Sequence, residues 1–115
     1  MANYADTMLF GEMFKIFVRY VHIPDEEIVK YCNINLERIY FIYSIENPAI
    51  LTMGEVNGLK HLMSVYMNRE LFTQKVSDDE EDYCWVIGKK LASLINMEYE
   101  KRASLTKGVQ RKREE

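Results

Sequence analysis

The sequence predicts an all-α fold, and three observations support this prediction. Apolar residues recur at steps of three and four along most of the chain, which is the spacing of one face of a helix. No long run alternates apolar and polar residues, as a half-buried strand would. Two short patterns, Thr52-x-x-Glu55 and Ser77-x-x-Glu80, precede apolar spacing and match the capping box that opens a helix.

The size and composition of the chain are typical of one compact domain. Its 115 residues are 48% hydrophobic and 29% charged, which excludes disorder over most of the length. No run of apolar residues is long enough to span a membrane, and no basic cluster precedes an apolar stretch as in a secretory signal. Cys32 and Cys84 lie far apart and match neither a disulfide framework nor a metal pair. We therefore expect two reduced, partly buried thiols in a cytoplasmic protein.

The first helix is expected over residues 6–21, and a second helix follows at once. A second helix is expected to begin at Pro24, because proline is tolerated in the first turn of a helix. The acidic residues 25–27 then meet the positive end of the helix dipole. One apolar stripe of about four turns marks the first helix and consists of Leu9, Met13, Phe14, Phe17, Val18 and Val21.

Asparagines and a proline mark the boundaries of the next two helices. Asn33 is expected to end the second helix in the left-handed conformation, which asparagine tolerates better than most residues. Asn35 is expected to cap a third helix that continues to Tyr43. Pro48 interrupts the helical pattern, and the first capping box then opens a fourth helix.

Two further helices complete the predicted fold. Asn68 is expected to cap a short fifth turn, and the second capping box to open a last helix from Asp78 to about Ala103. We therefore divide the chain into residues 1–76 with five short helices, residues 77–104 with one long helix, and a basic, flexible tail at 105–115. Charge follows this division: residues 77–100 hold seven acidic and two basic residues, whereas residues 101–115 hold six basic and two acidic ones.

Residues 25–44 form the most informative segment, because they predict two short helices joined by a three-residue turn. A helix-turn-helix must reverse the chain within a few residues, which needs a residue that tolerates positive φ followed by an apolar one. Asn33 and Ile34 meet both demands, and Ile39 is placed to pack the second helix against the first. The alternative is that this segment is simply two packed helices of a small bundle.

With these residues the chain resembles the Cro/repressor-type (XRE-like) helix-turn-helix family. The resemblance covers about residues 9–72, through the stretches PDEEIVKYCNINLERIYFIYSIENPAI and LTMGEVNGLKHLMSVYMNREL. It implies a five-helix Cro/repressor-like domain, here followed by a long C-terminal helix. It also implies a small DNA-binding transcriptional regulator of phage or mobile-element type, acting as a dimer on operator DNA. The third helix would then enter the major groove.

The resemblance also implies which residues would contact duplex DNA. Asn35, Glu37 and Tyr40 would read bases, while Arg38 and the basic tail would contact phosphates. The full set that the resemblance implies in the helix-turn-helix is Lys30, Asn35, Leu36, Glu37, Arg38, Tyr40 and Phe41. The charge of the tail adds Lys107, Arg111, Lys112 and Arg113 as expected phosphate contacts, and the alternative is that the tail is simply a solvated end.

A second function fits the same segment. Residues 1–76 hold seven basic against nine acidic residues, so they predict no basic face. Tyr40, Phe41 and Tyr43 fall within four residues, and they either complete the core or form a surface patch that favours a protein partner. The alternative to DNA binding is therefore a protein-binding module that reuses the scaffold as an inhibitor or antirepressor.

The apolar stripe of the last helix admits two interpretations. It could cover the first helix of its own chain, or it could pair with a second copy. We expect a homodimer, because a protein that reads paired half-sites needs two-fold symmetry. The residues expected at that interface are Ile87, Leu91, Leu94 and Ile95.

Nothing in the sequence indicates an enzyme. The two histidines, His22 and His61, are isolated, and no histidine pair with metal-ligand spacing occurs. Glycine-rich phosphate loops and GxSxG or HExxH motifs are absent as well. We therefore expect no catalytic residues, no metal and no cofactor.

Overall fold

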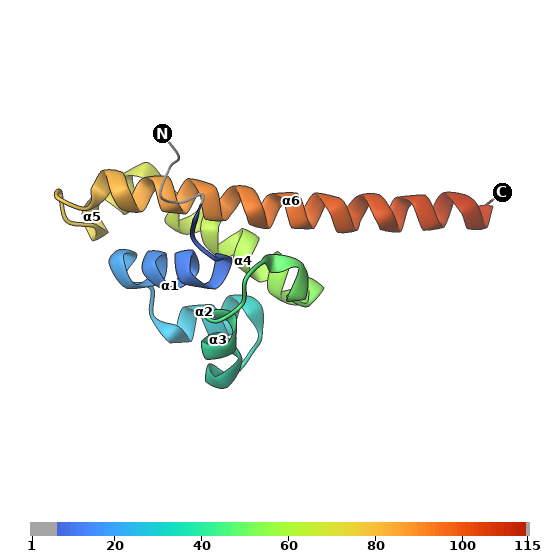
Figure 1. The fold of residues 1–115 in the computed structure, drawn as a ribbon, viewed down its shortest axis with the longest axis horizontal. Coiled ribbons are helices and arrows are strands. Elements are labelled where there is room, and N and C mark those ends of the chain that lie inside the picture. Colours follow the sequence, from blue (N-terminus) through green and yellow to red (C-terminus); the bar gives the residue numbers. More distant parts are fainter. Residues whose placement is uncertain (1–6, 115) are drawn as a thin grey trace.

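The computed structural model describes the backbone of residues 7–114 and the side chains of residues 7–105. Helices account for the regular structure of this part of the chain, which contains no strand, and the all-α prediction is confirmed (Figure 1). The elements are α1 (Phe10–Val21), α2 (Asp25–Cys32), α3 (Leu36–Ile42), the short 3-10 helix η2 (Pro48–Ile50), α4 (Met53–Tyr66), α5 (Arg69–Lys75) and α6 (Glu81–Glu114).

Most of the expected caps are present. Asn33 has φ 55° and ends α2 in the left-handed region, as expected. The side-chain oxygen of Asn35 accepts a hydrogen bond from the amide of Arg38 at 2.9 Å and caps α3. At the start of α4 the capping box is complete. The amide of Glu55 donates to the hydroxyl oxygen of Thr52 at 3.1 Å, and the amide of Thr52 donates to the carboxylate of Glu55 at 2.8 Å. These local signals therefore set the helix boundaries where the sequence placed them.

Three boundaries differ from the expectation. Helix α1 begins at Phe10 rather than near residue 6, so Leu9 precedes the stripe and is 46% exposed. Helix α6 begins at Glu81, because residues 78–80 form a turn that is closed by a bond from the amide of Glu80 to the carbonyl of Ser77 at 3.0 Å. At its other end α6 continues beyond residue 104 to Glu114. That segment contains no proline and is rich in Lys, Arg, Gln and Glu, which favour helices.

Helix α6 runs along one side of the molecule and packs against α1 and α4, while α2 and α3 lie on the opposite side (Figure 1). This packing changes the role of the α6 stripe. Ile87, Leu91 and Ile95 are at most 1% exposed and belong to the chain's own core, and Leu94 is half-buried against it. The stripe therefore covers helices of the same chain and is not open to a second copy, in contrast to the expected dimer interface.

Two glycines let backbones approach closely around α2 and α3. A Cβ on Gly58 of α4 would lie 2.5 Å from the carbonyl oxygen of Tyr31, so α2 rests directly on α4. A Cβ on Gly11 of α1 would lie 2.5 Å from the carbonyl oxygens of Ile42 and Tyr43. The amide of Gly11 also donates to the carbonyl of Ile45 at 2.9 Å. The end of α3 is thereby held against the start of α1.

Arg102 fastens the far part of α6 to the segment between α3 and α4. Its Nη2 donates to the carbonyl of Leu51 at 2.7 Å and to that of Ala49 at 3.2 Å, and its Nε pairs with Glu98 at 2.6 Å. The guanidinium thus satisfies carbonyls around η2 that lie outside regular helix. Among the described residues, no helix combines the length and apolar character needed to cross a membrane.

Candidate interaction surface

The corner between α2 and α3 determines which side of α3 faces outward. The amide of Asn33 donates to the carbonyl of Val29 at 2.8 Å, and the left-handed residue then redirects the chain into α3. Ile34 is half-buried in the corner, while Ile39 and Ile42 are fully buried. Since these isoleucines anchor α3 to the core, the remaining side of the helix is directed to solvent.

The solvent-facing side of α3 carries large apolar side chains. Leu36 is 47% exposed, Tyr40 is 59% exposed and Phe41 is 44% exposed, and Glu37 lies exposed beside them. We call these four residues the α3 face. Isolated exposed apolar residues are ordinary, but three on a helix of seven residues form a patch.

Tyr43 does not belong to the α3 face. Its ring lies 5.5 Å from that of Phe14 in the core, and burial raises the pKa of its hydroxyl to about 12, with smaller contributions from Asp25 and Tyr40. The two possibilities that the sequence left open are therefore both realised. Tyr43 helps to complete the core, whereas Tyr40 and Phe41 remain on the surface.

Arg38, the one basic residue of α3, is held by a carboxylate. Its Nε and Nη2 lie 2.7 and 2.9 Å from the two carboxylate oxygens of Glu55, in a two-point pair. Its guanidinium also lies 4.6 Å from the centre of the Phe41 ring. Glu55 is only 1% exposed, and the hydrogen bond from Arg38 lowers its pKa. The positive charge of Arg38 is therefore largely neutralised before any ligand arrives.

Sequence reasoning assigned Glu55 only to the capping box and missed this ion pair. Arg38 and Glu55 lie 17 positions apart, and no spacing rule connects them. The only signal was compositional: Lys30 and Arg38 are the two basic residues among residues 25–55, which contain six acidic ones.

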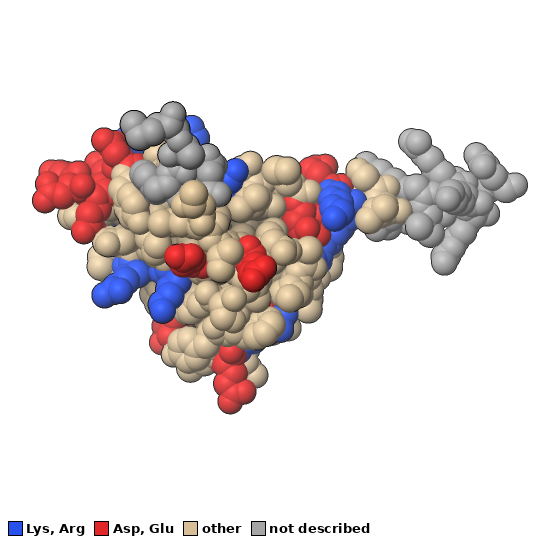
Figure 2. Space-filling view, viewed as in Figure 1, with Lys and Arg blue, Asp and Glu red and all other residues tan. Residues whose placement is uncertain are grey.

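Helices α2 and α3 together carry more acidic than basic residues. Residues 25–27 carry three carboxylates on the first turn of α2, and Glu37 lies on the α3 face itself. Lys30 is exposed near the end of α2. Figure 2 shows that the end of the molecule formed by α2 and α3 presents mostly uncharged side chains with an acidic one at its tip. This surface would repel phosphates more than it would attract them.

The DNA-contact residues that the resemblance implies are not gathered into one basic surface. Leu36, Glu37, Tyr40 and Phe41 share the α3 face, but the side-chain oxygen of Asn35 is occupied as a cap. Arg38 turns to Glu55, and Lys30 lies on the neighbouring helix. The side chains of Lys107, Arg111, Lys112 and Arg113 lie outside the described part of the chain.

A groove of about 750 Å³ lies at the corner, between the turn after α2 and the start of α4. Cys32 borders this groove, and burial raises the pKa of its thiol to about 12, with a smaller contribution from the charge of Glu55. The Cys32 thiol therefore stays protonated near neutral pH. A thiol with so high a pKa is a poor nucleophile. No cluster of three or more potential metal ligands occurs among the described residues.

Comparisons with known proteins found no match: no protein-family model fits the sequence, and neither the curated proteins nor the solved structures contain a significant relative.

Proposed function

We propose that the chain is a protein-binding module in which the α3 face contacts the partner. The observation that carries this proposal is the exposure of Leu36, Tyr40 and Phe41 on one short helix. Aromatic side chains are enriched at protein interfaces and supply much of their binding energy, whereas charged residues are depleted at interface centres. The α3 face has this composition.

The scaffold we infer is a Cro/repressor-like helix-turn-helix domain with the long α6 added. Three features support this: the succession of five helices α1–α5, the left-handed Asn33 between α2 and α3, and the outward position of α3. A scaffold that presents a helix to a DNA groove presents it equally well to a groove of a protein.

The exposed area is large enough to matter energetically. Complete burial of one such side chain stabilises by about 1.5–3 kcal/mol, and each of the three still has roughly half of its surface to bury. Glu37 lies on the α3 face itself, and residues 25–27 add three carboxylates on the preceding helix α2. We therefore expect a partner surface with an apolar pocket and basic or amide donors around it.

The second candidate is the DNA-binding regulator, which the outward position of α3 after a sharp turn also favours. In that case Asn35, Glu37 and Tyr40 would read bases, while Arg38 would contact phosphates. Arg38 would first have to leave Glu55, which would strand a buried carboxylate. The acidic surroundings make this the weaker of the two candidates.

A selection experiment tests the protein-binding proposal. The full chain is immobilised, and binders are selected from a library of displayed random peptides. We expect clones that bind the wild type but bind the variants Tyr40→Ala and Phe41→Ala at least about tenfold more weakly. The control variant Lys15→Glu, which changes an exposed residue on α1, is expected to bind these clones as the wild type does. Selected clones that bind all four proteins equally would contradict the proposal, provided that circular dichroism shows all four to be folded.

Fluorescence anisotropy with a random-sequence DNA duplex tests the second candidate. If the chain is a DNA-binding regulator, its affinity for the duplex should weaken steeply with salt. The affinity should also fall when Lys107, Arg111, Lys112 and Arg113 are changed to glutamine. The protein-binding proposal predicts that any such binding depends on the tail alone and is unaffected by Tyr40→Ala.

A further inference from the structure

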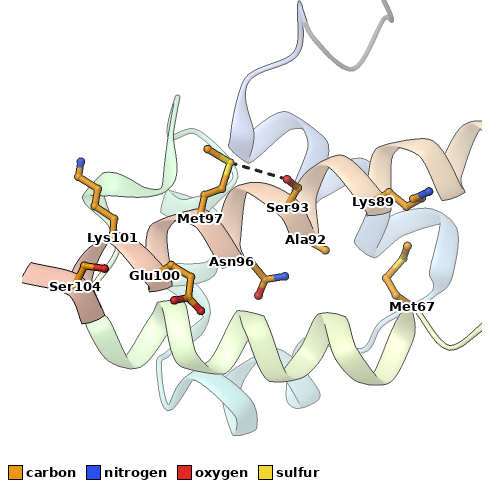
Figure 3. Close-up of a pocket in the computed structure, with 9 residues that line it drawn as sticks. All are labelled: Met67, Lys89, Ala92, Ser93, Asn96, Met97, Glu100, Lys101 and Ser104. Atoms are coloured by element: carbon orange, nitrogen blue, oxygen red, sulfur yellow. Dashed lines mark hydrogen bonds between the residues drawn. The ribbon is translucent and has the colours of Figure 1, made fainter. Parts of the chain in front are cut away.

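Helix α6 carries a second open surface, which is turned away from its buried stripe and is bordered on one side by Met67 at the end of α4. A groove of about 770 Å³ lies along this side, and Met97 within it is 64% exposed (Figure 3). We call six of its residues the α6 outer face: Lys89, Ala92, Ser93, Asn96, Met97 and Glu100.

The two charged residues of the α6 outer face lie at its ends. Lys89 and Glu100 are eleven positions apart, which is about three turns, so they lie on one line along the helix. Both are exposed, and neither forms an ion pair with any other residue that the structure describes. Within the face, Lys89 is therefore the positive end and Glu100 the negative end. Lys101 also lines the groove, but its side chain points to the other side of the helix from Glu100 (Figure 3).

A surface with opposite charges at its two ends is complementary to itself when it is turned end to end. Consider two α6 helices that lie antiparallel, related by a two-fold axis at the level of residues 94 and 95. Lys89 of each copy then faces Glu100 of the other. The same two-fold rotation places Met97 of one copy beside Ser93 of the other, and Asn96 beside Ala92. Figure 3 shows Met97 and Ser93 on one side of the helix, with Asn96 and Glu100 directed toward α4.

From this self-complementarity we infer that the α6 outer face binds a second copy of the chain, in an antiparallel pair of α6 helices. The small side chains of Ala92 and Ser93 let the two backbones approach and leave room for Met97. A contact of this kind uses the same patch on both copies, as two-fold dimers do. It leaves the core stripe of α6 in place and does not depend on the proposed function of the α3 face.

The charge pairs set the direction and register of the contact, while the apolar atoms around Met97 supply affinity. Charge reversal therefore provides a specific test. The single variants Lys89→Glu and Glu100→Lys each place like charges opposite one another at both ends of the pair. A mixture of the two variants restores opposite charges at both ends, and so does the double variant.

The experiment measures the dimer dissociation constant of the full chain by sedimentation equilibrium. We expect each single variant to dissociate at least about tenfold more readily than the wild type, whereas the equimolar mixture and the double variant return to within about threefold of it. Met97→Glu is expected to leave a monomer. Lys15→Glu on α1 has the same charge change as Lys89→Glu and is expected to have no effect.

Two results would overturn the inference. One is a wild-type chain that remains monomeric at about 100 µM, a concentration at which even a weak specific dimer is populated. The other is a dimer that is equally stable in both single variants and in their mixture, which would place the contact elsewhere. Thermal unfolding of each variant separates these results from loss of the fold, since Lys89 and Glu100 are exposed and their replacement leaves the core intact.

Discussion

The substitution Arg38→Ala tests whether Arg38 serves the fold or a ligand. In the structure the side chain of Glu55 is 2% exposed and that of Arg38 is 32% exposed, and two short hydrogen bonds join them. Removing one partner of a fully buried ion pair costs about 3–5 kcal/mol. Because a third of the Arg38 side chain is in solvent, water can reach Glu55 after the change, so we expect a smaller loss of about 2 kcal/mol.

Urea unfolding at 25 °C measures this loss, with two further variants for comparison. Arg38→Lys keeps the charge but not the two-point contact, and is expected to lose about half as much stability. Glu55→Gln keeps the shape of the capping residue but not its charge. The double variant Arg38→Ala, Glu55→Gln should lose less than the sum of the two single changes, because the second change removes a pair that is already broken.

The pH dependence follows from the direction of the Glu55 pKa shift. The pKa of Glu55 lies below its ordinary value of 4.5 in the folded chain, so the ion pair stabilises fully above pH 4.5 and loses its effect as pH falls through the lower value. The difference between wild type and Arg38→Ala is therefore expected to be constant from pH 7 to about pH 5.5 and to shrink below pH 4.5. If Arg38→Ala lowers the free energy of unfolding by less than about 0.5 kcal/mol at pH 7, the reasoning is refuted. It is also refuted if the stability difference between wild type and Arg38→Ala stays undiminished below pH 4.5.

Three other predictions concern the scaffold. Gly58→Ala forces a Cβ into the backbone of α2 and is expected to lower the free energy of unfolding by about 2 kcal/mol. Gly54→Ala, whose Cβ would meet nothing closer than 3.9 Å, is expected to be neutral or stabilising. Urea titration of both variants compares their stabilities directly. Asn33→Ala is expected to cost about 1 kcal/mol because alanine is strained at φ 55°, and Asn33→Gly is expected to cost much less. The thiols of Cys32 and Cys84, whose pKa values burial raises to about 12, are expected to react with a disulfide reagent at pH 8 only as fast as the chain opens. Immediate reaction of either thiol in the native chain would contradict their burial.

The order of the helices could be predicted from the sequence because the signals that set it are local. Asn33 and the box of Thr52 and Glu55 act on neighbours within a few residues, and both appear in the structure where they were expected. What each apolar stripe packs against depends on contacts between distant segments. The stripe of Ile87 and Leu91 could pack on the first helix of its own chain or on a second copy. We expected the second copy, and the arrangement in space shows that the stripe packs within its own chain.

The candidate site was predictable in part for the same reason. The spacing of residues 25–44 placed Tyr40 and Phe41 in a short helix after a sharp turn, and their exposure follows once Ile39 and Ile42 are buried. The charge count already predicted that residues 1–76 present no basic face. The neutralisation of Arg38 was not predictable, because its pair with Glu55 joins two helices across the fold. A count of basic residues therefore overstated the positive charge available to a ligand.

The most direct test of the central claim is an NMR titration of the full chain with a random-sequence DNA duplex at low salt, followed through the backbone amides of residues 35–41. The α3 face is apolar and acidic, and its one arginine is paired. We therefore predict that these amides do not shift, whatever happens at the basic end of the chain. Progressive shifts in residues 35–41 that disappear as salt is raised would show α3 in contact with DNA and would contradict the proposed protein-binding role.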